Sequence, residues 1–467
     1  MPALENNLAV TEASTHKKQL SRILSFRDLV LLIVGTVIGS GIFLVPGAVL
    51  KQVGNSVPLG LSVWLIGGVL SLLGALTYGE LSAMKPQAGG LYVYIRDCFG
   101  PFLAFLFGWT LFLVISSGSI ATLAVAFSNY LAEFIPLSHL WAKVISVLMI
   151  VVIGIVNVRG TRQSADLQNV TTAIKVAAIL IMSAVLLWLG KNHGVLPDSG
   201  GFINTGTSLA SGFGLAMISV LWAYEGWQYS TFSAGEVTNP QRDFGRALLA
   251  GSATLIGIYL FANVGYISAL GAQGVSQSNR VAATALSTVV GPGVAKLVTA
   301  TILIAMFSAA NSIVLTAPRV YYAMANDGLF FRKLAEVHPR FGTPAFAVIA
   351  LAAWSALLAA SGTFEQLLTY VIFIGWIFYA LAAASVFVYR KRMPNLERPF
   401  RVPGYPFTPL LFILAAALLV INTVIRQPAR AAIGLGIVLL GAPAYAIWRR
   451  RDHKSSANPA DVEVAKA

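Results

Sequence analysis

Long stretches with few or no charges recur along the 467-residue chain, and they restrict its fold more than any other feature. They lie at about residues 28–50, 58–84, 101–132, 141–157, 167–190, 207–234, 246–270, 293–318, 344–361, 366–389, 405–425 and 429–448. A helix of about 20 apolar residues spans a bilayer. Charged residues make up 11% of the chain, against about 25% in an average soluble domain. The pattern predicts an all-α membrane protein with twelve transmembrane helices.

Lysine and arginine are distributed unevenly among the segments that join these stretches. With the N-terminus placed inside the cell, 24 of the 32 fall on the cytoplasmic side, 7 fall on the other side, and Lys175 lies within a stretch. Cytoplasmic loops of membrane proteins carry an excess of these residues. The distribution predicts that both termini are cytoplasmic. It also accounts for the net charge of +14 without a nucleic-acid partner.

The two ends of the chain differ from the rest in composition. Residues 1–26 carry charges and lack the apolar core of a signal peptide, so we expect a disordered cytoplasmic arm there. We expect one membrane domain over residues 27–451 and a second disordered cytoplasmic tail over residues 452–467.

Cysteine and histidine leave little scope for covalent or metal chemistry. Cys98 is the only cysteine and lies in an expected cytoplasmic loop, so neither an internal disulfide nor one to an extracellular partner can form. The five histidines show no ligand spacing, and no P-loop motif occurs. We therefore predict no metal, no cofactor and no ATP-driven pumping.

Two of the stretches are interrupted near their centres. Residues 34–43 read VGTVIGSGIF, with three glycines and one serine, although glycine costs a helix about 1 kcal/mol relative to alanine. The sixth stretch contains WAYEGW at residues 222–227. The interruptions lie five stretches apart, so corresponding helices of two repeated halves would run in opposite directions. Paired broken helices of this kind indicate the binding site of a secondary transporter.

A broken helix offers both positive and negative backbone poles to a ligand. Free N–H groups and the helix dipole at Ser40 and Gly41 would favour a carboxylate, and carbonyls near Thr36 and Val37 would face an ammonium group. The interruption therefore suits a zwitterion. A simpler interpretation is that the glycines at positions 35 and 39 form a small-xxx-small motif for close helix packing.

Four motifs follow one another over most of the chain. They are VGTVIGSGIFLVP, LWAYEGWQYSTF with EVTNPQRD, SAANSIVLTAPRVYYAMANDGLFF, and RKRMPNLERPFRVP. In this order they resemble the amino acid–polyamine–organocation superfamily, and within it the L-type amino-acid transporters and their bacterial relatives. The resemblance implies the leucine-transporter fold, a 5+5 inverted repeat with broken helices 1 and 6. It also implies alternating access and a location in the cell inner (plasma) membrane.

The resemblance further implies roles for single residues. Ser40 and Gly41 would bind a substrate carboxylate, and carbonyls at Val37, Trp222 and Ala223 would receive its α-amino group. Trp222 also stands where the family has an aromatic gate over the substrate.

The sequence departs from the family pattern in three places. Gly375 stands where some members have an asparagine near the side-chain pocket, and Glu225 stands where many have a small residue. No cysteine occurs between the third and fourth stretches, so we expect no disulfide-linked heavy chain.

Two charged residues lie inside the expected membrane region, where such residues are functional candidates. Glu225 could be the counter-charge for a cationic substrate side chain, a proton-coupling group, or a protonated structural carboxyl. Lys175 lies about eight residues inside the fifth stretch, a depth from which a lysine can still snorkel to the interface. The resemblance implies instead that its ammonium takes the place of a bound sodium ion and bridges the fifth helix to the broken first.

Taken with the resemblance, the sequence favours an amino-acid antiporter, that is, a sodium-independent exchanger that binds its substrate at the two interruptions. A proton-coupled symporter and a carrier of polyamines or other amines are alternatives. A membrane amino-acid sensor is a weaker one, because no soluble signalling domain is evident. The apolar stretches contain no nucleophile–base pair or metal cluster, so we predict no enzyme activity. Asp28 and Glu80, at the cytoplasmic ends of their stretches, are candidates for an inner gate.

Overall fold

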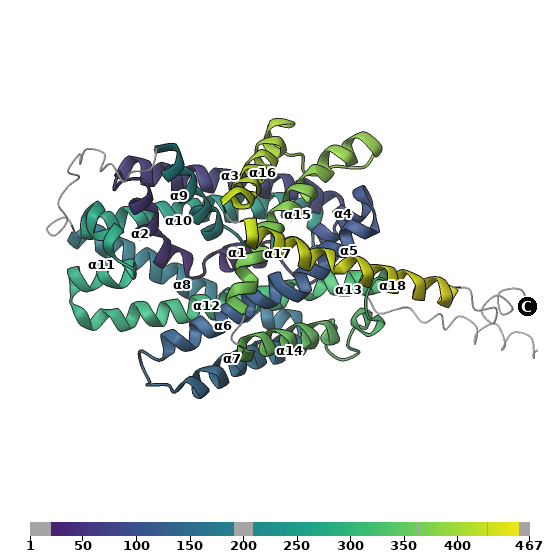
Figure 1. Ribbon diagram of the computed structural model, residues 1–467, viewed down its shortest axis with the longest axis horizontal. Helices are drawn as coiled ribbons and strands as arrows, with labels where there is room; N and C mark the ends of the chain where they lie inside the picture. Colours follow the sequence, from purple (N-terminus) through teal and green to yellow (C-terminus); the bar gives the residue numbers. More distant parts are fainter. Residues whose placement is uncertain (1–19, 191–208, 362–363, 427, 457–467) are drawn as a thin grey trace, which may run out of the picture.

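The computed structural model describes residues 20–190, 209–361, 364–426 and 428–456, and its regular structure there is helical (Figure 1). The α-helices are α1 (Phe26–Val37), α2 (Gly41–Gln52), α3 (Val57–Met84), α4 (Leu91–Phe99), α5 (Pro101–Thr110), α6 (Ser116–Leu131), α7 (His139–Arg159), α8 (Thr161–Leu189), α9 (Leu209–Ala223), α10 (Pro240–Gln277), α11 (Val281–Val290), α12 (Ala295–Thr316), α13 (Pro318–Asn326), α14 (Ala345–Ser361), α15 (Phe364–Arg392), α16 (Phe407–Arg426), α17 (Pro428–Leu439) and α18 (Gly441–Ser456). Shorter elements are the π-helix η1 (Leu111–Ile115) and the 3₁₀ helices η3 (Trp227–Glu236), η4 (Pro292–Val294) and η5 (Arg332–Ala335).

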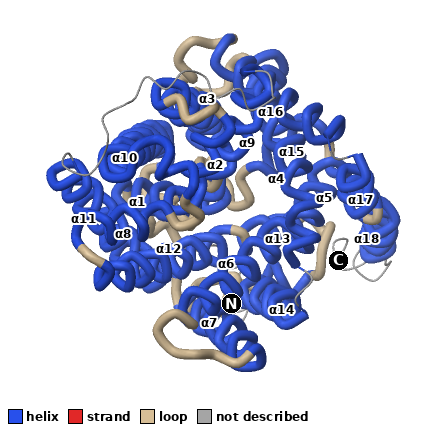
Figure 2. Tube along the Cα trace, turned by 60° about the vertical axis from the view of Figure 1, so that its left-hand side comes forward, coloured by secondary structure: helices blue, strands red, loops and turns tan. Residues whose placement is uncertain are grey.

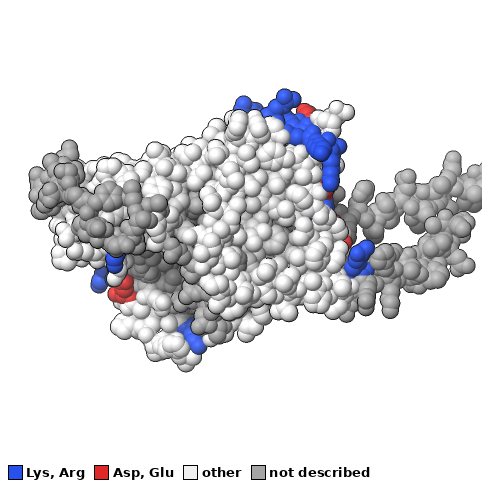
Figure 3. Space-filling view, turned by 45° about the horizontal axis from the view of Figure 1, so that its top comes forward, with Lys and Arg blue, Asp and Glu red and all other residues white. Residues whose placement is uncertain are grey.

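Within these ranges, eight helical segments are long and apolar enough to cross a membrane, and the bent pair α1–α2 makes a ninth if it is counted as one span. The other three expected stretches, at about 207–234, 344–361 and 366–389, fall on α9 with η3, on α14 and on α15. Figure 3 shows a broad face without charged side chains between groups of lysine and arginine at its edges. The chain is a multi-pass membrane protein, and the number of twelve spans stays a prediction.

The first interruption separates α1 from α2. Ser25 caps the start of α1, where its N–H donates to Asp28 Oδ2 at 2.8 Å and its Oγ accepts from the Asp28 N–H at 3.3 Å. The helical bonds of α1 end with Ile38 N–H donating to the Val34 carbonyl at 3.0 Å. The chain then turns over residues 38–40, and the axes of α1 and α2 differ by 49°.

The second interruption follows α9 and lies directly against the first. Gly226, between α9 and η3, has a φ of +130°, which side chains other than hydrogen rarely tolerate. A Cβ at Gly226 would lie 3.1 Å from the carbonyl carbon and oxygen of Thr36 at the end of α1. Glycine at this position therefore allows the two main chains to approach each other closely.

Neighbouring helices surround α1. It packs against α8, α10 and α12, and Figure 2 shows it among these helices. A buried polar network fixes α8 against α12: Asn311 Nδ2 donates to Gln168 Oε1 at 3.0 Å, and Gln168 Nε2 donates to Ser308 Oγ at 3.1 Å. Fully bonded buried networks of this kind make the packing of a core specific. They hold α8, which carries Lys175, at a fixed register beside α1.

Of the expected disordered arm over residues 1–26, residues 1–19 lie outside the described residues, and main-chain hydrogen bonds hold part of the described remainder. The N–H groups of Ile23 and Leu24 both donate to the carbonyl of Glu236, at 2.8 and 2.9 Å, and Thr238 N–H donates to the Leu24 carbonyl at 2.9 Å. These main-chain bonds fix the segment before α1, although its composition resembles that of a tail. At the other end of the chain, α18 continues to Ser456, beyond the expected boundary at residue 451 (Figure 1).

Candidate functional site

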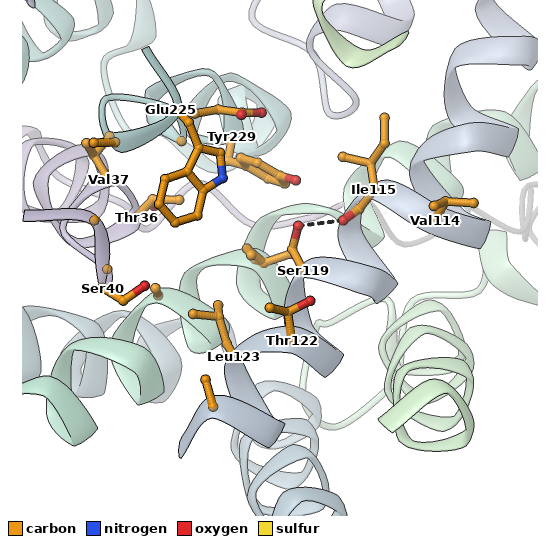
Figure 4. Close-up of a pocket in the computed structure, with 18 residues that line it drawn as sticks. Thr36, Val37, Ser40, Val114, Ile115, Ser119, Thr122, Leu123, Glu225 and Tyr229 are labelled. Atoms are coloured by element: carbon orange, nitrogen blue, oxygen red, sulfur yellow. Dashed lines mark hydrogen bonds between the residues drawn. The ribbon is translucent and has the colours of Figure 1, made fainter. Parts of the chain in front are cut away.

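A cavity of about 200 Å³ lies where the two interruptions face α6 and α12 (Figure 4). Its walls come from the first interruption (Thr36, Val37, Gly39, Ser40, Gly41), the second (Trp222, Ala223, Glu225, Gly226, Tyr229), η1 and α6 (Val114, Ile115, Ser119, Thr122, Leu123, Ala126), and α12 (Ala309, Ile313). Pockets for drug-sized ligands usually measure about 300–1,000 Å³. This cavity therefore suits a smaller molecule.

The structure brings together every residue that the sequence singled out for substrate binding. All of them line the cavity: Thr36, Val37, Ser40, Gly41, Trp222, Ala223 and Glu225. Lys175 is not in the cavity wall, and it lies behind the first interruption instead.

The N-terminal end of α2 borders the cavity, and in its first turn the Phe43 N–H donates to the Ser40 carbonyl at 3.1 Å. The N–H groups in the first turn of a helix have no carbonyl partner within that helix. Ser40 precedes this turn and Gly41 begins it, and both border the cavity. Together with the positive end of the helix dipole, this arrangement can hold an anionic group.

The carbonyls at the ends of α1 and α9 converge on one hydroxyl. Tyr259, fully buried on α10, places its OH 3.2 Å from the Val37 carbonyl oxygen and 3.1 Å from that of Ala223. The Val37 carbonyl also accepts from Gly39 N–H at 2.8 Å, so the Ala223 carbonyl is the one that keeps clear capacity for a further donor. The carbonyl end of α9 therefore lies in the cavity wall close to the N-terminal end of α2. Sequence reasoning missed Tyr259, because nothing local distinguishes it from the other membrane tyrosines.

The three glycines of the first interruption have different surroundings. A Cβ at Gly35 would overlap the side chains of Gln168 and Thr172, so the close-packing interpretation applies there. A Cβ at Gly39 would meet nothing within 4 Å, so that interpretation fails at Gly39. A Cβ at Gly41 would lie 3.0 Å from Ala223 Cβ, which places Gly41 between the cavity and the second interruption.

Glu225 is held at one of its two carboxylate oxygens. Its Oε1 accepts from the Tyr379 hydroxyl of α15 at 2.9 Å and from Gln228 Nε2 at 3.5 Å. The Gln228 amide is oriented because its Oε1 accepts from Gly226 N–H at 3.0 Å. Among the described residues, Glu225 Oε2 has no hydrogen-bond partner, and the side chain borders the cavity beside Tyr229 (Figure 4). One oxygen therefore remains free to accept a hydrogen bond from a ligand.

Lys175 reaches the first interruption from α8. Its side chain is fully buried, and Nζ donates to the carbonyls of Gly35 at 2.6 Å and Ile38 at 2.7 Å. The ammonium therefore does not snorkel to the surface. It satisfies carbonyls of the kind that coordinate sodium beside the unwound helices of other transporters.

The third wall of the cavity was not foreseen. The helix there contains the π-helical turn η1, a feature that often marks functional sites, and Ser119 Oγ donates to the Ile115 carbonyl at 2.6 Å beside it (Figure 4). The signal available in the sequence was the run SSGS at residues 116–119, which is unusually polar for an apolar stretch.

The two carboxylates proposed as gate residues lie at the end of the molecule that also holds Ser25 and Glu236. We call it the inner end, because the charge distribution predicts that it is cytoplasmic. Asp28 joins α1 to α8, accepting from Arg162 at 2.9 and 3.0 Å and from Asn169 at 2.6 Å. Glu80 instead joins α3 to α15, accepting from Arg390 at 2.9 and 2.6 Å.

Comparison with known proteins shows the family to which this chain belongs. Residues 24–440 match the family model described as amino acid permease. The serine/threonine exchanger SteT of Bacillus subtilis (strain 168) is 32% identical over 94% of this chain and 99% of its own. The cystine/glutamate transporter of Homo sapiens is 33% identical over 94% of this chain and 87% of its own. The large neutral amino acids transporter small subunit 2 of Rattus norvegicus is 31% identical over 91% of this chain and 80% of its own. The chain therefore belongs to the amino acid permease family, with the L-type transporters of the amino acid–polyamine–organocation superfamily.

Proposed function

We propose that the chain is a sodium-independent amino-acid exchanger that binds one substrate in this cavity and works by alternating access. The observation that carries the proposal is the meeting of two interrupted helices around one cavity, with N–H groups on one side and carbonyls on the other. Relatives that are named as exchangers or transporters of amino acids support the same substrate class. The proposal includes twelve spans in a 5+5 inverted repeat, both termini in the cytoplasm, and the inner membrane as location.

The two backbone poles would hold the two ends of an amino acid. Its carboxylate would accept from the N–H groups at Ser40 and Gly41, and its α-ammonium would donate to the carbonyls of Val37 and Ala223. Trp222, which is 43% exposed, would cover the site as an aromatic gate. The proposal includes no disulfide-linked heavy chain, because Cys98 is buried on α4.

The position of Lys175 supports transport without sodium. A fixed ammonium that donates to two carbonyls of the interrupted helix supplies the positive charge that a bound cation would otherwise supply there. Its charge is covalently attached to α8, whereas a bound ion could leave.

Glu225 has three possible roles in this proposal. Held through Oε1, the carboxylate can offer Oε2 to a guanidinium or ammonium group, so that cationic amino acids are accepted as well as neutral ones. The same acid could instead carry a proton, which would make the chain a proton-coupled symporter. A purely structural carboxyl is the third interpretation.

We expect Gly41→Val to abolish amino-acid uptake in proteoliposomes. The added side chain would press against Ala223, which lies 3.0 Å from the Cβ position, and would occupy the space for the carboxylate. Gly257→Val, at an exposed glycine with nothing within 4 Å, is the matched control and should transport normally. Normal uptake by a well-folded Gly41→Val protein would remove the carboxylate site from this position.

Sodium should make no difference to wild-type uptake when it is replaced by choline. Lys175→Ala should insert into the membrane but lose most uptake, because two carbonyls of the interrupted helix lose their donor at about 1–3 kcal/mol each. Lys296→Ala, at an exposed lysine, controls for loss of a positive charge. A sodium requirement in the wild type, or full activity of Lys175→Ala, would contradict the proposed role.

Competition assays should show that arginine and lysine bind the wild type. Charge-assisted hydrogen bonds contribute about 1.5–3 kcal/mol. Glu225→Gln should therefore lower the affinity for arginine and for lysine by roughly one to two decades and leave the affinities for alanine and leucine little changed. Tyr379→Phe should lower the affinities for arginine and lysine less, because it removes only the hydroxyl that orients Glu225 Oε1.

The same assays at two pH values distinguish the alternatives for Glu225. Proton coupling predicts neutral substrates only, with uptake driven by an imposed pH gradient and that drive lost in Glu225→Gln. If arginine and lysine fail to compete at any pH, the counter-charge interpretation is wrong.

A further inference from the structure

The segment that joins α15 to α16 at the inner end is folded around one arginine. Arg398 Nη2 donates to the carbonyls of Tyr389 at 3.2 Å and Met393 at 2.7 Å. Its Nη1 donates to the carbonyl of Leu396 at 2.8 Å. Because one side chain bonds several carbonyls, the segment has a defined shape. We call residues 393–406 the basic loop.

The basic loop is also fixed to α3. Glu80 of α3 accepts from Arg390 Nε at 2.9 Å and Nη2 at 2.6 Å, and its Oε2 also accepts from the Val402 N–H at 2.7 Å. The ring of Phe400 packs on Gly79, where a Cβ would lie 3.1 Å from the ring. These contacts hold the loop against the helices, so its charged side chains start from fixed positions.

The loop and the end of α15 carry more positive charge than their acidic partners balance. Glu80 serves two arginines with one carboxylate, at 2.6 Å from Arg390 and 3.7 Å from Arg398. Lys391 and Arg401 are exposed, and neither forms an ion pair with another residue that the structure describes. An excess of positive charge therefore remains at this surface.

An aromatic ring holds one of these arginines at the edge of the protein. The Arg390 guanidinium carbon lies 3.7 Å from the centre of the Tyr405 ring, which is 37% exposed. Arg390 Nη1 has no hydrogen-bond partner among the described residues. Val402 N–H and Arg390 Nη2 donate to the same Glu80 oxygen, and Arg401 directly precedes Val402. Two guanidinium groups can therefore reach one anionic group.

An apolar helix face continues from the basic loop. The helix α16 begins directly after the loop and is long and apolar enough to cross a membrane. One of its faces has side chains that are 49–68% exposed and recur every three or four residues: Phe407, Leu411, Leu414 and Leu418. This face meets the acyl chains of the bilayer. A ligand at this place would therefore meet cations at one end and apolar side chains along the rest of its length.

We propose that the basic loop and this face of α16 bind an anionic phospholipid. The guanidinium groups of Arg390 and Arg401 hold its phosphate through charge-assisted hydrogen bonds, and Lys391 adds a further positive charge. An acyl chain lies along α16 from Phe407 onward. Clusters of lysine and arginine beside a spanning helix attract anionic headgroups. The proposal goes beyond transport and does not depend on which substrate the chain carries.

Binding is measured by the fluorescence anisotropy of phosphatidylglycerol labelled on an acyl chain, titrated with purified protein in dilute detergent. Phosphatidylcholine with the same label, whose headgroup has no net charge, is the reference lipid. We expect the wild type to bind phosphatidylglycerol much more tightly than phosphatidylcholine. Added salt should weaken the binding of phosphatidylglycerol, because it screens exposed charges. Equal affinities for the two lipids in the wild type would overturn the proposal.

A pair of exposed cations can be removed with a matched control. Lys391→Gln/Arg401→Gln should lower the affinity for phosphatidylglycerol roughly 30-fold and leave that for phosphatidylcholine unchanged. Arg22→Gln/Arg340→Gln removes two exposed arginines elsewhere at the inner end, and this protein should bind both lipids as the wild type does. Unchanged phosphatidylglycerol affinity in the first variant, or an equal loss in the second, would contradict the proposed site.

A variant with the opposite effect excludes misfolding as the explanation. Glu397 is the acidic residue of the basic loop and is exposed, so Glu397→Gln should raise the affinity for phosphatidylglycerol several-fold, which a misfolded protein would not do. An unchanged or lowered affinity in this variant would count against the proposal.

Soluble competitors distinguish a lipid from a free phosphate. Inorganic phosphate and glycerol phosphate present the same anionic group without acyl chains, so neither should displace phosphatidylglycerol at an equal concentration. Displacement by either of them at that concentration would show a phosphate site without a contribution from α16, and the lipid proposal would be wrong.

Discussion

Main-chain groups that a broken helix leaves unpaired must find partners inside the protein, because the hydrocarbon of a membrane offers none. The partners found here define the site. Lys175 satisfies the carbonyls of Gly35 and Ile38, and Tyr259 lies between those of Val37 and Ala223. What remains beside the cavity is the N-terminal end of α2 and the further bonding capacity of the Ala223 carbonyl. A zwitterion can complete this arrangement.

The same constraint explains why the interruptions lie against each other. Gly226 can approach Thr36 only because it has no side chain, and this approach places both sets of carbonyls beside one tyrosine. Packing of the neighbouring helices then holds the two interruptions in this position. The amides of Asn311 and Gln168 fix α8, and α8 in turn positions the ammonium of Lys175 behind the interruption.

Sequence reasoning reached the parts of this arrangement that depend on local pattern. The glycines in VGTVIGSGIF and the aromatic run WAYEGW disturb long apolar stretches, so both interruptions could be located, and all seven residues chosen from them or by resemblance line one cavity. Residues that depend on packing between distant segments could not be found in this way. Tyr259 and Tyr379 resemble many other membrane tyrosines in the sequence. The bonds of Leu24 with Glu236 and Thr238 are made by main-chain atoms, which carry no sequence signal.

The central claim is that this cavity exchanges one amino acid for another without using an ion gradient. Uptake of a labelled amino acid into proteoliposomes, with the interior either empty or preloaded with unlabelled amino acid, tests it most directly when no sodium or proton gradient is present. The account predicts rapid uptake only into preloaded vesicles, at a rate that does not change when a sodium or pH gradient is then imposed. Equal accumulation in empty vesicles that appears only with an imposed sodium or proton gradient would contradict it.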